Sequence, residues 1–252
     1  MAFEKGNEST PNKLYTGLAD VKVVAVNPTK EEAEKLGISM KADPVYTSVD
    51  DTTGNRKVRI DIYVTSDKTS KIDKMAFFLE DAPRVSEKGN TQFINDFGDA
   101  SFSESIEAIA SNPKMSWFKS DGIRPAFGGE ADLIDFIKAL LNIQKGSIAK
   151  LDNPKALFTG NVSEIAAIFK ANPERKVQVL YTVRENDGNW YQGIYTKYFG
   201  RAGNTKTTYW QKHMDNLTTV VNYQNSFAFQ EFNPLEVTVE KSTSDAPEQK
   251  FW

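Results

Sequence analysis

The strictest alternation in the chain runs over residues 56–64 and predicts a β-strand with one buried face. Branched aliphatic residues occupy every second position: Val58, Ile60, Ile62 and Val64. The residues between them are Lys57, Arg59, Asp61 and Tyr63. Successive side chains of a strand point to opposite faces, so the aliphatic set faces a core and the other set faces solvent or a ligand.

Further strands are expected along the chain from the same kind of pattern. A β-branched run at 21–26 ends at Asn27-Pro28, and apolar segments follow at 74–79 and 92–97. Near the other end, period-two segments at 176–184 and 190–199 flank Asp187-Gly188. An Asp-Gly pair accepts the positive backbone angles of a tight turn, so these two segments predict a hairpin.

Three helices are expected between these strands. Thr29 and Glu32 have the spacing of a capping box, which opens a short helix that ends at Gly37. Residues 133–141 repeat apolar side chains at i, i+3, i+4 and i+7, the pattern of a helix packed on a core. Asn161 followed by Glu164 opens the third helix, which Asn172-Pro173 ends.

This order of elements predicts an α+β fold with an antiparallel, β-rich core. We expect an OB-like barrel with a large helical insertion, although other antiparallel sheets fit the same order. Residues 13–241 are expected to form a single domain with the insertion around 99–172. Residues 1–12 are expected to be a flexible arm, and residues 242–252 a flexible tail ending in Phe251-Trp252.

The composition excludes several kinds of chemistry. The chain has no cysteine and one histidine, His213, so disulfides, thiolate metal sites and histidine-rich zinc sites are not expected. No phosphate-binding loop or nucleophile elbow is present, which predicts a protein that is not an enzyme and needs no cofactor or metal. A carboxylate-metal nuclease remains a distant third hypothesis.

No apolar run has transmembrane length, and the first residues lack the apolar stretch of a signal peptide. We therefore expect a cytoplasmic protein, in the host cytoplasm if it is viral, with no membrane contact. The formal net charge of -3 does not mark a nucleic-acid binder. Phosphate binding depends on the local field of a groove, however, and acidic residues elsewhere can mask a basic face.

The most informative stretch interleaves aromatic residues with cations from Arg175 to Lys212. Such a surface can stack bases and hold phosphates, although aromatic residues also favour strands for packing alone. Alternation assigns Tyr181 to the core. It leaves four candidates facing a ligand near the small Gly193: Tyr191, Tyr195, Lys197 and Arg201.

A second candidate surface is the polar face of 56–64, with Lys57, Arg59 and Tyr63; an ordinary solvated strand face explains it equally well. The two surfaces reinforce each other if they belong to one sheet. The tail offers a third feature, a linear motif for a protein partner formed by Asp245, Glu248, Phe251 and Trp252.

Three stretches resemble the single-stranded DNA-binding proteins of tailed bacteriophages. They are Lys13-Leu14-Tyr15-Thr16-Gly17 through Val26-Asn27-Pro28, Lys57-Val58-Arg59-Ile60-Asp61, and Tyr195-Thr196-Lys197-Tyr198-Phe199-Gly200-Arg201. The resemblance implies an OB-fold core that binds single-stranded DNA without sequence preference during phage DNA replication or recombination. It also implies an acidic tail that recruits replication proteins. This tail departs from that pattern, because it is weakly acidic and carries Lys250.

The expected roles follow from side-chain chemistry. Phosphates would contact the four cations Lys57, Arg59, Lys197 and Arg201, and bases would stack on Tyr63, Tyr191 and Tyr195. The alternative is a virion or assembly protein, whose aromatic hairpin and tail make protein–protein contacts. The negative net charge suits that alternative.

Overall fold

The computed structural model describes residues 12–15, 17–69, 71–144, 146–147, 161–186, 189–203 and 236–239. His213 and the whole segment 242–252, including Asp245, Glu248, Phe251 and Trp252, lie outside these residues. So do residues 1–11 of the expected arm and the Asp187-Gly188 turn.

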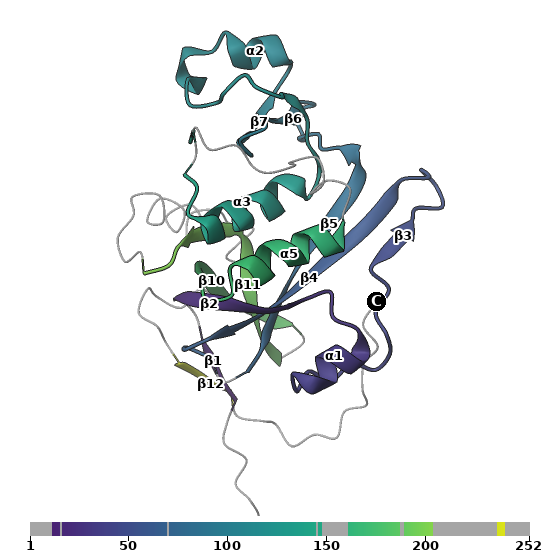
Figure 1. The fold of residues 1–252 in the computed structure, drawn as a ribbon, viewed down its shortest axis with the longest axis vertical. Coiled ribbons are helices and arrows are strands. Elements are labelled where there is room, and N and C mark those ends of the chain that lie inside the picture. Colours follow the sequence, from purple (N-terminus) through teal and green to yellow (C-terminus); the bar gives the residue numbers. More distant parts are fainter. Residues whose placement is uncertain are drawn as a thin grey trace, which may run out of the picture.

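A seven-stranded antiparallel sheet forms the body of the molecule (Figure 1). Its hydrogen-bonded order is β11-β10-β2-β4-β5-β9, and β3 adds to the side of β4. The strand bounds are β2 (Gly17–Val26), β3 (Thr47–Val49), β4 (Arg56–Ser66), β5 (Asp73–Pro83), β9 (Phe127–Gly128), β10 (Lys176–Asn186) and β11 (Asn189–Arg201). The predicted antiparallel, β-rich core is confirmed.

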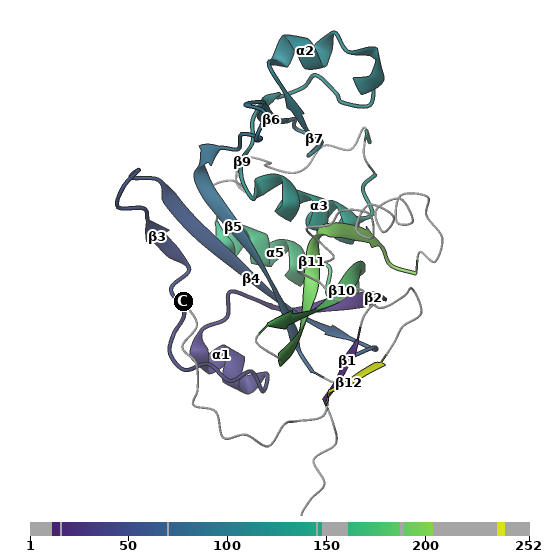
Figure 2. The ribbon, with the colours of Figure 1, turned by 180° about the vertical axis from the view of Figure 1, so that it is seen from behind.

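The sheet curls into a half-barrel and does not close, so the expected OB-like barrel is wrong at that level of detail. Strands β11 and β9 end the order, and no strand pair among the described residues joins them. Helices α3 (Glu130–Leu141) and α5 (Val162–Ala171) lie on one side of the curled sheet (Figures 1 and 2).

An aromatic cluster joins these helices to the sheet. The ring of Phe136 on α3 lies 6.0 Å from Phe77 of β5, 5.8 Å from Phe169 of α5 and 5.0 Å from Phe199 of β11. Val58, Ile60, Ile62 and Val64 are buried beneath them, which confirms the core face predicted for residues 56–64. The predicted helices at 133–141 and after Asn161 are confirmed as well.

Residues 91–125 form a small unit of their own at one end of the molecule (Figure 1), and the strand expected at 92–97 corresponds to its first strand. It contains a three-stranded sheet and two short helical elements: β6 (Thr91–Ile94), β7 (Ala100–Ser103), β8 (Arg124–Pro125), α2 (Ile106–Ala110) and the 3-10 helix η1 (Pro113–Met115). Phe93, Ile109 and Phe118 form its separate core. We call this unit the cap.

The remaining elements are short. Strand β1 (Asn12–Tyr15) pairs with β12 (Glu236–Val239), and helix α1 (Lys30–Lys35) follows β2. The capping box is confirmed, because the Thr29 side chain accepts from the Glu32 backbone while the Glu32 side chain accepts from the Thr29 backbone. No helix in the described ranges is long and apolar enough to cross a membrane.

Candidate functional site

The polar face of β4 is only partly open, because the segment between β2 and β3 covers it. The Asn27 side chain donates to the Arg59 carbonyl at 2.9 Å and accepts from the Asp61 amide at 2.6 Å. Tyr46 closes the same segment by donating to the Pro28 carbonyl. Under this cover Tyr63 is 6% exposed, and burial raises the pKa of its hydroxyl. The expectation that Tyr63 faces solvent or a ligand is wrong.

Arg59 remains accessible but is held in place from two sides. Its Nε lies 3.1 Å from Oδ1 of the buried Asp61, and its guanidinium carbon lies 5.5 Å from the centre of the Tyr46 ring. Lys74 of β5 approaches the other Asp61 oxygen at 3.5 Å. A guanidinium fixed by an ion pair and a ring loses little further freedom when it binds a ligand.

Lys57 lies at the exposed end of the same strand face. Its Nζ is 2.7 Å from Oδ2 of Asp50, and this ion pair lowers the pKa of Asp50 and raises the pKa of Lys57. The pair is exposed to solvent, so a phosphate can compete for the ammonium group.

The sequence reasoning missed Phe78, the ring that completes this face. Phe78 of β5 lies directly opposite Arg59 of β4 and is 67% exposed. Its neighbour Phe77 points into the core. Strict alternation through Met75, Phe77 and Leu79 was the signal that would have placed Phe78 outside. We call Tyr46, Lys57, Arg59, Lys74 and Phe78 the outer face.

The hairpin candidates lie on two different sides of β11. Tyr195 pairs with Leu180 of β10, yet Phe199 pairs with the adjacent Val179, so residues 196–198 have no opposite partner on β10. An odd number of inserted residues reverses the side to which the following residues point. The expected common face is therefore wrong: Tyr191 and Tyr195 lie on the convex side, and Arg201 lies on the concave side with Phe199.

The two candidate surfaces belong to one sheet but lie near opposite ends of it. Through β10, Tyr195 is level with Leu18 at the start of β2. Three residues further along β2, Val21 pairs with Ser66 at the end of β4, and Arg59 lies seven residues before Ser66. These ten residues span roughly 33 Å at about 3.3 Å per residue. Arg59 and the tyrosines of β11 therefore lie at different levels along the strands of the sheet.

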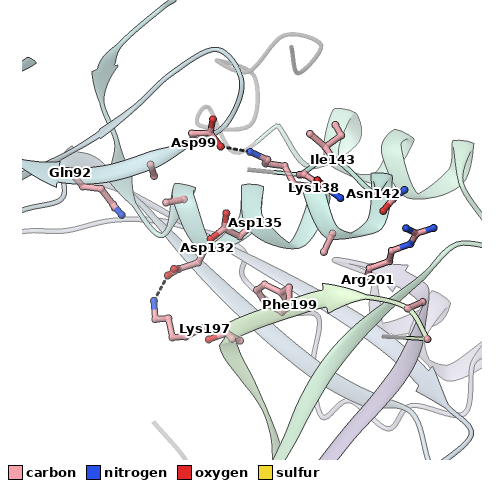
Figure 3. A pocket seen from close by; sticks show the side chains of 17 residues that line it. Gln92, Asp99, Asp132, Asp135, Lys138, Asn142, Ile143, Lys197, Phe199 and Arg201 are labelled. Atoms are coloured by element: carbon pink, nitrogen blue, oxygen red, sulfur yellow. Dashed lines mark hydrogen bonds and ion pairs between the residues drawn. The ribbon is translucent and has the colours of Figure 1, made fainter. Parts of the chain in front are cut away.

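Lys197 and Arg201 instead line a groove between α3 and β11, with a volume of about 860 Å³ (Figure 3). Lys197 forms an ion pair with Asp132 of α3, and Arg84 approaches the same Asp132 oxygen at 3.4 Å. On the far side of α3 a second ion pair joins Lys138 to Asp99 at 2.7 Å.

Burial separates the other residues of the hairpin into a core face and an exposed face. Tyr181 is fully buried together with Val177 and Val179, so its predicted place in the core is confirmed. Tyr191 is exposed, as expected for a ligand-facing residue. A Cβ atom added at Gly193 would have no other atom within 4 Å, so the backbone there is open on the side of the sheet that Gly193 faces. Within the described ranges, no three residues of the metal-binding types cluster closely enough to hold an ion.

No protein-family model matches this chain, and no similar protein was found among the curated proteins or the solved structures.

Proposed function

We propose that this protein is a non-catalytic, sequence-nonspecific single-stranded DNA-binding protein that acts in phage DNA replication or recombination, with the outer face as its DNA-binding surface. One observation carries the proposal: the exposed Phe78 ring lies directly opposite Arg59, whose guanidinium is held against Tyr46. A flat ring beside fixed cations suits a strand whose bases are unpaired.

The exposed ring supplies the stacking part of this proposal. A phenylalanine on a solvent-facing strand gains little from folding, since most of its ring stays in water. A base stacked on it removes that apolar area from water and contributes about 1–3 kcal/mol by alanine substitution. Every base has such a flat surface, which is why this contact does not select a sequence.

The cations of the outer face supply the phosphate part. Lys57 is bonded to Asp50, and both Arg59 and Lys74 face Asp61. Phosphates must therefore share or displace carboxylates, so fewer counterions are released than the number of cations would suggest. We expect binding with a shallow salt dependence, in keeping with a net charge of -3.

The test is fluorescence anisotropy of labelled oligo-dT, titrated at two salt concentrations. We expect micromolar or tighter binding that weakens with salt, and a Phe78→Ala loss of about 5–150-fold, the equivalent of one stacked base. The matched control is Phe102→Ala, since Phe102 is an exposed phenylalanine of the cap with Arg84 5.8 Å from its ring centre. Absence of salt-sensitive binding, or equal losses in the two variants, would contradict the proposal.

The tyrosines on the convex side of β11, Tyr191 and Tyr195, are an alternative place for the DNA to bind. If the bound DNA follows the convex side of the β10–β11 hairpin, Tyr191→Ala weakens oligo-dT binding and Phe78→Ala does not. A loss in both variants indicates a DNA path that crosses from the hairpin to β4 and β5. Deletion of 242–252 is expected to abolish recruitment of replication proteins while leaving oligo-dT affinity intact.

A virion or assembly protein is the second candidate, and the apolar edge of β3 favours it. Val45 and Val49 are 76% and 61% exposed beside the outer strand of the β3–β4–β5 ribbon (Figure 2). Exposed apolar side chains beside an open strand edge are typical of protein–protein contact. Co-purification with capsid or tail components, together with no response to oligonucleotides, would support this function instead.

A further inference from the structure

The groove between α3 and β11 has the size of a small-molecule site and a mostly polar lining. Its volume of about 860 Å³ lies within the ~300–1,000 Å³ that such sites occupy. The floor is the solvent-facing stripe of α3, with Asp132, Asp135, Ala139 and Asn142 at helical spacing. Strand β11 forms one wall, and Asp99, Ala100 and Gln92 of the cap form the other (Figure 3).

Arg201 is a cation at one end of this groove. Its side chain reaches over the end of α3 toward Asn142 (Figure 3), and it makes no hydrogen bond or ion pair with the parts of the chain that the structure describes. Guanidinium groups bind phosphate with two parallel hydrogen bonds, so an unpaired arginine in a concave site is suited to an anionic group.

Lys197 can also turn toward a ligand without leaving Asp132, its ion-pair partner, without a cation. Asp132 interacts with Lys197 and with Arg84, so it keeps one cation if Lys197 turns toward the groove. Lys138 and Asp99 neutralise each other. The groove lining holds three carboxylates, Asp99, Asp132 and Asp135, and three cations, Lys138, Lys197 and Arg201, so its formal charges cancel. The two cations that can turn to a ligand, Lys197 and Arg201, both come from β11.

Gln92 gives an independent indication of a ligand at the opposite end. Gln92 is 8% exposed and lines the groove, and its buried Oε1 accepts no hydrogen bond from any residue that the structure describes. Buried amides are nearly always hydrogen-bonded, and one that lacks a partner carries a free-energy cost. The amide can rotate by 180° to present either its oxygen or its nitrogen to a bound hydroxyl group.

We propose that this groove binds a small phosphate monoester carrying several hydroxyl groups, such as a sugar phosphate or a nucleoside monophosphate. The phosphate lies at Arg201, with Lys197 as the second cation. The hydroxyl groups lie along α3, where the Asp135 carboxylate and the Thr196 hydroxyl line the groove, and reach the Gln92 amide. This site does not depend on the proposed DNA-binding surface, which belongs to the outer side of β4 and β5.

The experiment is isothermal titration calorimetry of the full chain with four probes: ribose 5-phosphate, thymidine 5′-monophosphate, thymidine and inorganic phosphate. We expect one of the two esters to bind at least tenfold more tightly than inorganic phosphate, with no binding of thymidine; the better ester identifies the scaffold. Arg201→Gln should weaken that ester at least tenfold, and Gln92→Leu should weaken it while retaining bulk.

The matched control is Arg56→Gln, which removes the same charge from β4, away from the groove. Circular dichroism checks that each variant is folded. The proposal is overturned if neither ester binds more tightly than inorganic phosphate, or if Arg201→Gln and Arg56→Gln bind the ester equally well. Oligo-dT titration of Arg201→Gln separates the two sites: unchanged DNA affinity with lost ester binding supports the groove as a site of its own.

Discussion

Lys138 of α3 and Asp99 of the cap form an ion pair that is almost completely removed from solvent. Their side chains are 6% and 0% exposed, and Nζ lies 2.7 Å from Oδ1. The backbone amide of Gly146 also donates to both oxygens of Asp99, at 3.2 and 3.1 Å. This one carboxylate therefore connects the cap to α3 and to the chain that follows it.

Replacing Lys138 should be far more harmful than replacing a surface lysine. Lys138→Met leaves Asp99 buried without its cation, which typically costs about 3–5 kcal/mol. Lys35→Met is the matched control, because Lys35 and Glu31 form an exposed pair at 2.8 Å worth about 0.3–0.5 kcal/mol. Urea unfolding measures both variants, and a similar small loss in each would show that the buried pair contributes little.

Two adjacent phenylalanines of β5 should separate stability from binding. Phe77→Ala removes a ring from the aromatic cluster around Phe136 and should cost about 3–5 kcal/mol of unfolding free energy. Phe78→Ala removes an exposed ring and should change stability by about 0.5 kcal/mol or less. Thermal unfolding of the two variants decides this; a large loss in Phe78→Ala would mean that the ring supports the fold.

The outer-face lysines should set part of the salt dependence of DNA binding. Lys57→Gln and Lys74→Gln should each weaken oligo-dT binding and reduce the slope of log affinity against log salt by up to about 1. Lys35→Gln on α1 is the control and should leave the slope unchanged. A slope that stays the same in the outer-face variants would argue that phosphates bind elsewhere.

Gly129 should be among the least replaceable residues of the chain. It precedes α3 with φ 75°, and a Cβ placed there would lie 2.0 Å from the carbonyl oxygen of Phe78. Gly54 has a similar φ of 71° with open space around it. Gly54→Ala should therefore cost only the ~1 kcal/mol of left-handed backbone strain, and Gly129→Ala several times more. Chemical denaturation measures the unfolding free energy of both variants: Gly54→Ala reports the backbone strain alone, and Gly129→Ala reports the strain together with the clash against Phe78.

Stability should fall in alkaline solution because of buried tyrosines. The Tyr181 hydroxyl donates to Asp73 at 3.0 Å, and burial together with the Asp73 charge raises its pKa. The folded chain thus keeps this proton to higher pH than the unfolded chain, whose tyrosines titrate near about 10. The contribution of the Tyr181 hydroxyl to the free energy of unfolding is therefore fully present below about pH 10 and decreases as the pH rises above that value.

Tyr181→Phe should therefore show a shallower loss of unfolding free energy above about pH 10 than the natural chain. The Tyr181→Phe variant should still lose some unfolding free energy at alkaline pH, because burial also raises the pKa of three other tyrosines, Tyr15, Tyr46 and Tyr63. Tyr191→Phe is the control at an exposed position. Identical pH profiles for Tyr181→Phe and the natural chain would contradict the assigned role of the buried hydroxyl.

Much of the local structure follows from the sequence, because the forces that set it act between near neighbours. Alternation in 56–64 identifies the four aliphatic residues of β4 that point into the core. The Thr29–Glu32 capping box and the apolar stripe of α3 are likewise determined within a few residues. The Asp-Gly pair in the sequence at 187–188 predicts a hairpin, and strands β10 and β11 on either side of it pair antiparallel.

Only the tertiary structure decided which of the candidate side chains are available and which of them lie together. Tyr63 has the alternation of an exposed residue but is covered by the segment around Asn27 and Tyr46, more than fifteen residues away in the chain. Residues 196–198 of β11 form a bulge, so Arg201 faces α3 and not the side of Tyr191 and Tyr195. Strict alternation would have placed all of these residues on one side. Periodicity records only the direction in which a side chain points; what covers it depends on contacts between distant parts of the chain. The curled sheet and the helices within it set those contacts.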